Sequence, residues 1–200
     1  MLTHQERQAL PAHSIVLEPH SSKFDSAGRH VARQAIEAGL GTKVQCTACR
    51  LFFIQGDLPP ERLAELTDLL LDPVVERVAD TKDFDHFVDV ALLPGVTDTE
   101  GESLLRAAHQ MGFTEVTKAS RAFRYCFRFA SPVSEKQLAS FVARELANEV
   151  IERLSVDNPL VNPFIQHLEK PGEPEPISLK GLQGDDLARL STELRLALNE

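Results

Sequence analysis

The strongest constraint on the fold is a weak internal repeat. One copy covers residues 13–79 and the other residues 86–157. Both copies open on a histidine followed by apolar residues, and both then reach an Asp-x-x-Gly motif, at residues 25–28 and 98–101. Later features agree in order and spacing as well. We therefore predict two units with one shared succession of strands and helices, rather than two modules that are alike by chance.

A helix is predicted after each Asp-x-x-Gly motif, ending near Gly39 in the first copy and near Gly112 in the second. Thr97 or Asp98 can cap the second of these helices, because a short polar side chain accepts a hydrogen bond from a free amide of the first turn. Each helix has an apolar stripe with helical spacing, which indicates one buried side. The stripes are Val31, Ala32, Ala35 and Ala38 in the first, and Leu104, Leu105, Ala108 and Met111 in the second.

A β-rich segment follows each helix, at residues 49–54 and 123–129. In the second segment aromatic residues alternate with Arg124, Cys126 and Arg128. Alternation with a period of two predicts a strand that has one buried face and one wetter face.

A second helix and a short strand close each copy. Ser134 and Gln137 fit a capping box, and Pro60 suits a first helical turn. The closing segments, residues 73–78 and 149–154, are nearly identical and are interpreted as short strands. The prediction is an α+β protein with two tandem β-α-β-α-β modules. Since the core of so small a unit is marginal, packing the two together would bury more apolar surface.

The composition narrows the classes of function. The 200-residue chain has a formal net charge of −9, which disfavours electrostatic binding to nucleic acid or to an anionic membrane. No apolar run approaches the roughly 18 residues that a membrane-spanning helix needs. The first residues lack the apolar stretch of a secretory signal, so we expect a cytoplasmic location. Three cysteines, an odd number, argue against a disulfide framework.

The sequence changes character after the second copy. Residues 158–176 contain repeated prolines and are interpreted as a linker. A final amphipathic helix is predicted at residues 184–198. A short helix of this kind is marginal alone in water, so we expect it to pack on something outside the two copies.

Several of these segments resemble a known family. The turn Pro94-Gly95-Val96-Thr97-Asp98-Thr99-Glu100-Gly101 resembles the start of PurS, the small subunit of phosphoribosylformylglycinamidine synthase. The segment Met111-Gly112-Phe113 resembles the Leu-Gly-Phe that ends the first PurS helix, and residues 148–152 are similar to the Asn-Pro-Val-Ile-Glu that ends PurS. The first copy matches more weakly, mainly at residues 71–76. Residues 182–187 and 197–200 are similar to the start of the linker region of the large subunit, PurL.

The resemblance implies a set of domains. These are an N-terminal extension (1–12), a first PurS-like module (13–80), a second PurS-like module (84–157), a linker (158–176) and the start of a PurL-like linker region (177–200). PurS works as a dimer in systems with separate subunits. Two copies in one chain would therefore form a covalent pseudo-dimer with a fixed effective concentration.

The resemblance also implies a non-catalytic role. The complete synthase of purine biosynthesis is a ligase that uses ATP, Mg²⁺ and ammonia released from glutamine, whereas PurS supports assembly and ammonia transfer between PurL and PurQ. We expect no catalytic, cofactor-binding or metal-binding residues in this chain, and we expect PurL-like and PurQ-like partners.

One departure from the PurS pattern concerns a Gly-Lys pair that PurS usually carries. Here the text is Ser120-Arg121-Ala122-Phe123-Arg124, so a contact through that lysine is not carried over, and Arg121 or Arg124 can substitute.

The candidate partner contacts are Pro94, Gly95, Asp98, Gly101, Arg121, Arg124 and Arg128. The arginines can dock an acidic partner surface, or they can lie on a solvated sheet face beside glutamates of the same chain. The spacing of Cys46 and Cys49 is that of a metal or redox pair. Because a structural zinc site usually needs four ligands, we interpret them as buried or incidental.

Two other functions stay open. Paired α+β units can bind a small ligand at their interface, as a regulatory module would. The chain can also be a fragment without an independent function, which the uncapped end at Glu200 favours.

Overall fold

The structure is a computed structural model that describes residues 11–79, 83–160, 163–164 and 189. Two compact units divide the chain, Met1–Gln166 and His167–Glu200. Within the first unit, the described elements follow each other as two rounds of strand, helix, strand, helix, strand. They are β1 (Ala12–Pro19), α1 (Ser26–Glu37), β2 (Val44–Gly56), α2 (Pro60–Leu70), β3 (Glu76–Val78), β4 (His86–Leu92), α3 (Thr99–Gln110), β5 (Val116–Phe129), α4 (Glu135–Glu145) and β6 (Glu152–Val156).

The helix starts follow the capping rules. Asp25 and Asp98 are the N-caps of α1 and α3, and each accepts a hydrogen bond from the glycine three residues on. The capping box of Ser134 and Gln137 is formed at the start of α4. Asp98, rather than Thr97, is thus the cap of α3. These features confirm the predicted starts of three helices.

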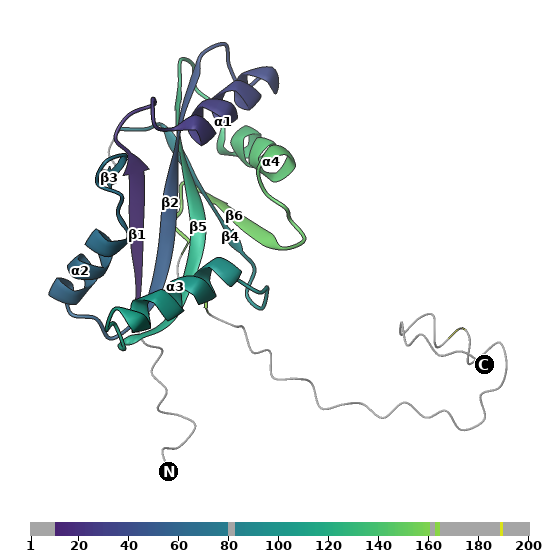
Figure 1. Cartoon of the computed structure of the whole chain (residues 1–200). Helices are drawn as coiled ribbons and strands as arrows, with labels where there is room; N and C mark the ends of the chain where they lie inside the picture. The colour runs from purple at the N-terminus through teal and green to yellow at the C-terminus, as the bar shows by residue number, and fades with distance from the viewer. Residues whose placement is uncertain (1–10, 80–82, 161–162, 165–188, 190–200) are drawn as a thin grey trace. The chain divides into compact units, whose positions relative to one another are not determined.

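The strands form one continuous sheet with the order β3-β1-β2-β5-β4-β6, which Figure 1 shows with β2 and β5 at its centre. Every pairing is antiparallel. Strands β2 and β5 pair along their whole length, from Val44 opposite Phe129 to Gly56 opposite Val116. The first round therefore supplies one half of the sheet and the second round supplies the other half.

Helices α1, α2, α3 and α4 cover the same face of this sheet, and each of the two core clusters on that face takes helices from both rounds. In one cluster, Val31 of α1 packs with Phe141 of α4 over Phe127. In the other, Leu66 of α2 packs with Ala108 of α3 over Phe52. The cores of the two rounds are therefore interleaved rather than separate, as the pairing of α1 with α4 in Figure 1 illustrates.

The opposite face of the sheet has a smaller apolar cluster built on Leu51, Phe53, Ala91 and Ala122. Leu160 and Phe164, from the segment after β6, pack against this cluster. Leu160 also donates its backbone N–H to Asp89 Oδ2 of β4, at 3.0 Å. The segment that follows β6 therefore contacts the helix-free face of the sheet.

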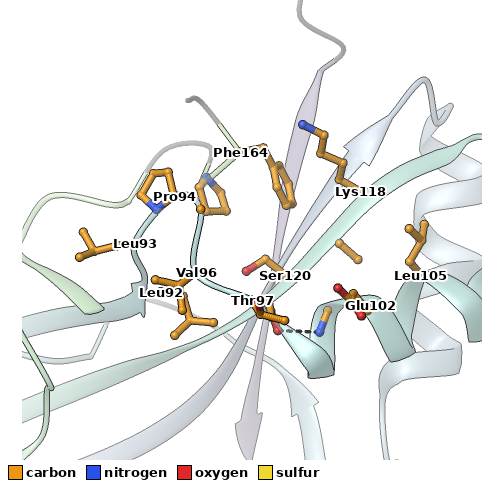
Figure 2. A pocket seen from close by; sticks show the side chains of 15 residues that line it. Leu92, Leu93, Pro94, Val96, Thr97, Glu102, Leu105, Lys118, Ser120 and Phe164 are labelled. Carbon is orange, nitrogen blue, oxygen red and sulfur yellow. Dashed lines mark hydrogen bonds between the residues drawn. The ribbon is translucent and has the colours of Figure 1, made fainter. Parts of the chain in front are cut away.

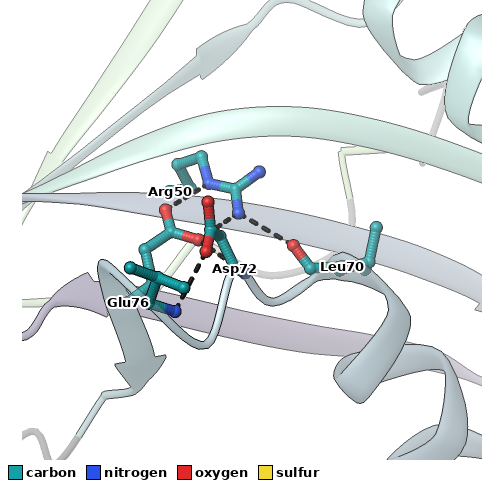
Figure 3. Close-up of polar contacts among 5 residues, drawn as sticks. Arg50, Leu70, Asp72 and Glu76 are labelled. Carbon is teal, nitrogen blue, oxygen red and sulfur yellow. Dashed lines mark hydrogen bonds and ion pairs between the residues drawn. The ribbon is translucent and has the colours of Figure 1, made fainter.

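An identical turn precedes the outer strand of each half. In the first, Asp72 Oδ1 accepts the Val74 N–H and Glu76 Oε2 accepts the Asp72 N–H. In the second, Asn148 and Glu152 make the same two bonds. Figure 3 shows that the first turn is further tied to β2, because Arg50 donates to Glu76 and to the carbonyl of Leu70.

Some predictions need correction. The closing segments were predicted as strands from residues 73 and 149, but strands β3 and β6 begin only at Glu76 and Glu152, because the turns occupy the preceding residues. Met111 was placed on a buried stripe, but it is 58 % exposed because α3 ends at Gln110. The predicted helix at residues 184–198 lies outside the described residues apart from Arg189. None of the described helices is long and apolar enough to cross a bilayer.

Candidate functional site

The candidate site lies where the long strand β5 extends beyond its neighbour β4. Strand β5 begins at Val116, but its pairing with β4 starts only at Ala122. Over the first residues of β5, the place of β4 is taken by the turn that leads into α3. This overhang brings the turn, the start of α3 and the exposed edge of β5 together.

Asp98 fixes this arrangement. Its Oδ1 accepts the Gly101 N–H at 2.7 Å, and its Oδ2 accepts the Arg121 N–H of β5 at 3.2 Å. A Cβ atom on Gly101 would lie 2.3 Å from the carbonyl oxygen of Ala119, so only glycine permits this approach of helix to strand. Gly95 has a φ of +91°, a left-handed conformation that also favours glycine. Asp98, Gly101 and Gly95 therefore have structural reasons to be present.

A pocket of about 270 Å³ opens above this turn. Figure 2 shows Pro94, Phe164 and Lys118 along one rim and Thr97, Glu102 and Leu105 along the other, with Ser120 between them. The Lys118 Nζ lies 5.9 Å from the centroid of the Phe164 ring. Most of the lining is apolar, with few polar groups, so the pocket suits contact with an apolar group.

The predicted contacts on the turn do come together, since Pro94, Gly95, Asp98 and Gly101 all line this pocket. Pro94 and Gly95 are exposed there, whereas Asp98 is only half-buried and Gly101 is buried. Of these four residues, Pro94 and Gly95 are therefore the two that are exposed.

The three arginines of β5 do not form one basic face. Arg121 lies on the helix side of the sheet and pairs with Glu100 at 2.6 Å. Arg124 and Arg128 point to the opposite side, where Arg124 pairs with Asp89 and Arg128 pairs with Asp83. Each arginine thus has an acidic partner within the chain.

Arg124 also corrects the prediction of a wetter face. Its residue exposure is 9 %, because Asp89 on β4 accepts from both its Nε and its Nη2. Burial alone would lower the pKa of Arg124, but the hydrogen bonds and charge of Asp89 outweigh it and raise that pKa. Arg124 is a structural residue rather than a contact available to a partner.

The cysteines do not assemble a site. Cys46 packs against the core under α1 and α4, whereas Cys49 is buried near the opposite face. Burial raises the pKa of the Cys46 thiol well above its usual value, and the pKa of Cys49 is also raised, first by a hydrogen bond with Cys126 and then by burial. Raised pKa values leave the thiols protonated and unreactive. Within the described ranges, no group of three or more His, Cys, Asp and Glu side chains is placed to hold a metal ion.

Sequence reasoning missed two parts of this region. One is Phe164, which lies in the segment predicted as a linker but packs against the helix-free face of the sheet. The other is Asp89, fully buried in β4. An aspartate within an otherwise apolar strand signals a buried ionic partner, but the sequence does not say which arginine it meets.

Comparison with known proteins identifies the second half of this sheet. Residues 86–159 match the family described as PurS, phosphoribosylformylglycinamidine (FGAM) synthase. The PurS subunit of phosphoribosylformylglycinamidine synthase from Archaeoglobus fulgidus is 36 % identical over 72 residues, which cover 34 % of this chain and 90 % of that subunit. The matched family segment runs from the first residue of β4 to just beyond β6, and it includes the Pro94–Asp98 turn and the lining of its pocket except Pro163 and Phe164. The chain therefore belongs to the PurS family.

Proposed function

We propose that this chain is a non-catalytic assembly component of phosphoribosylformylglycinamidine synthase in purine biosynthesis. The observation that carries the proposal is the family match over residues 86–159, which spans a complete round of strands and helices. In this proposal the chain contacts a PurL-like synthetase and a PurQ-like glutaminase, supports ammonia transfer, and leaves ATP, Mg²⁺ and the chemical steps to those partners.

The proposal includes a second PurS-like module at residues 13–80. The geometry of the two halves supports it. Asp25 repeats the bonds of Asp98, because it accepts the Gly28 N–H at 2.6 Å and the Ala48 N–H at 3.0 Å. The sequence separations are the same in both halves, 3 and 23 residues. With the repeated outer turns and the central β2–β5 ladder, these bonds support a covalent pseudo-dimer.

The chemistry of the pocket at the Pro94–Asp98 turn fits contact rather than catalysis. The carboxylate of Asp98 in its lining is committed to holding the turn and the helix start. Pro94 and Gly95 at its mouth are exposed. We therefore assign the partner contact to this turn.

The test is assembly of the complete enzyme. The full chain, carrying an affinity tag, is mixed with the PurL-like and PurQ-like proteins of the same source, and co-purification and glutamine-dependent synthase activity are measured. The proposal predicts a complex that contains this chain and activity that falls when it is left out. A Pro94→Asp variant should bind more weakly, while the matched variant Pro132→Asp, in the loop before α4, should not.

The proposal fails if the chain neither joins the complex nor changes glutamine-dependent activity. A rise in melting temperature with a free nucleotide or amino acid, in the absence of assembly, would instead support a regulatory small-molecule module.

A further inference from the structure

The first half of the sheet has a pocket of its own at the corresponding overhang. Strand β2 begins at Val44, but its pairing with β1 starts only at Arg50. Beside the uncovered residues lies a pocket of about 690 Å³, lined by the loop before α1, by α1 and by residues 44–47 of β2. We call it the α1 pocket and the one at the Pro94–Asp98 turn the α3 pocket.

Contacts of the two helix-start glycines show that these pockets correspond. A Cβ on Gly28 would meet the Cys46 carbonyl at 2.4 Å, as a Cβ on Gly101 would meet that of Ala119 at 2.3 Å. The residue that follows each glycine lines the pocket of its own half: Arg29 lines the α1 pocket and Glu102 lines the α3 pocket. The two neighbours of each carbonyl residue do so as well, Gln45 and Thr47 in the α1 pocket and Lys118 and Ser120 in the α3 pocket. The two pockets therefore overlap at corresponding places in the two halves, although the α1 pocket extends further along its helix, to Arg33, Ile36 and Glu37.

The α3 pocket shows which kind of side chain a pocket at this position can hold. The chain's own Pro163 and Phe164 lie in its wall, and Phe164 contacts both Lys118 and the apolar cluster of the helix-free face. The α1 pocket has no comparable segment in its wall among the described residues, and it is the larger of the two. An aromatic side chain from a segment outside the helices and strands, packed at such a pocket, thus has a precedent in this fold.

The charge of the α1 pocket differs from that of the α3 pocket. Glu102 at the rim of the α3 pocket is replaced by Arg29, and Lys118 is replaced by Gln45. Arg33, one helical turn further along α1, adds a second guanidinium to the rim. Glu37 is the one acidic residue in the lining. The rim therefore carries an excess of positive charge in a chain whose net charge is −9.

Arg29 and Arg33 also differ from the arginines of β5 in their hydrogen-bond and ion-pair partners. Arg29 donates to the carbonyls of Ser22 and Lys23, and Arg33 contacts His30. Neither has an ion pair with a carboxylate in the described part of the chain, although the charge of Arg29 acts on the buried Asp25. Both side chains are exposed, and Ile36, further along α1 in the same lining, is 41 % exposed. Exposed cations around an apolar surface favour a ligand that has both carboxylates and an apolar group.

We infer that the α1 pocket docks a segment of a partner polypeptide in which an aromatic residue is flanked by Asp or Glu. The aromatic side chain packs on the apolar residues of the lining, Ala32, Ile36 and Val44. The flanking carboxylates pair with Arg29 and Arg33. This inference rests on the proposed function, since it takes the chain to be an assembly component, and it gives the two halves different partners.

The test uses the full-length chain and a fluorescein-labelled peptide with the sequence Glu-Pro-Phe-Glu-Asp, followed by fluorescence anisotropy. We expect saturable binding that weakens as salt is raised, because exposed ion pairs are screened. Arg33→Glu should weaken binding by about tenfold, the loss of roughly 1.4 kcal/mol. The matched control is Arg106→Glu, at the corresponding position of α3, which should leave binding unchanged. A peptide with Lys in place of each acidic residue should bind more weakly than the acidic peptide.

The inference is overturned if the acidic peptide does not saturate, or if Arg33→Glu and Arg106→Glu have equal effects. It is also overturned if the peptide binds only through self-association of the chain, which sedimentation at the same concentrations would reveal. The outcome is separable from that of the proposed function, because this assay contains no synthase subunits. Normal synthase assembly without peptide binding would overturn this inference alone, and peptide binding without synthase assembly would contradict the proposed function.

Discussion

Asp89 and Arg124 form a bidentate ion pair on neighbouring strands, with Nε–Oδ1 and Nη2–Oδ2 distances of 2.7 and 2.8 Å. The Asp89 side chain is fully buried, and its Oδ2 also accepts the Leu160 N–H. The pair therefore connects β4, β5 and the segment after β6 at one point on the helix-free face.

Removing the charge of Asp89 should be strongly destabilising. Asp89→Asn leaves the Arg124 guanidinium buried without its counter-ion, a change that typically costs about 3–5 kcal/mol. Urea unfolding would measure it. Asp83→Asn is the matched control, because Asp83 pairs with Arg128 but its side chain is 89 % exposed, and its loss should change stability only slightly. Equal effects of the two variants would show that the buried pair does not stabilise the fold.

A methyl group on Gly101 should disturb the α3 pocket. Gly101→Ala places a Cβ against the backbone carbonyl of Ala119, and β5 cannot move away because it pairs with β2 throughout. Crowding of this kind typically costs about 1–3 kcal/mol. Thermal unfolding measures the loss, with Thr99→Ala, an exposed position in the same helical turn, as the control that should lie within about 0.5 kcal/mol of wild type.

The pH dependence of stability should contain a contribution from His86. Its Nε2 donates to the Val133 carbonyl at 2.9 Å, and its Nδ1 lies 2.6 Å from Asp157 Oδ2. Partial burial alone would lower the pKa of His86, but the hydrogen bond and charge of Asp157 outweigh it, so the pKa is raised above 6.5. The folded state therefore holds this proton more tightly than the unfolded state does. The resulting stabilisation is fully present below the unfolded pKa and is lost as pH rises through the folded pKa.

Asp157→Asn tests this contribution, because asparagine tolerates the φ of +53° at this position while removing the charge. Urea unfolding at about pH 5.5 and about pH 8.5 brackets the ordinary histidine pKa. The free energy that the variant loses should be larger at the lower pH. If the loss is the same at both, His86 does not titrate in the way that its contacts indicate.

Phe164→Ala should loosen the segment after β6. Phe164 is half-buried against the cluster that contains Leu51 and Phe53, so its truncation should cost about 1–3 kcal/mol. Hydrogen exchange should quicken at the Leu160 amide, whose bond to Asp89 depends on the position of the segment. Phe24→Ala, at a 48 % exposed aromatic residue, is the control. An unchanged exchange rate at Leu160 would show that Phe164 does not hold the segment in place.

Local features of the fold were predictable from the sequence because they depend on neighbours in the chain. The caps at Asp25, Asp98 and Ser134 each act on an amide three residues away, and the alternation of β5 reports its own two faces. The α+β class and the order of elements followed from these signals.

Features that join distant strands could not be predicted in this way. The pairing of β2 with β5 depends on which strand edges meet, and no local pattern encodes that choice. Arg124 was interpreted as facing a wetter surface because its partner Asp89 lies 35 residues away on another strand. The site was predicted in part: the Pro94–Asp98 turn followed from motifs, whereas Phe164 and the α1 pocket depend on tertiary packing.

The centre of the β2–β5 ladder sets Arg50 directly opposite Phe123. In an assembly of two identical chains, a residue on the symmetry axis must face another copy of itself, so an arginine there would meet an arginine. In a single chain, the two residues that face each other there are different positions of the sequence, so each can be a different amino acid. One side can hold a cation that ties Glu76 and the end of α2 to the sheet, while the other holds an aromatic ring. Joining both halves in one polypeptide thus lets each change its surface independently of the other.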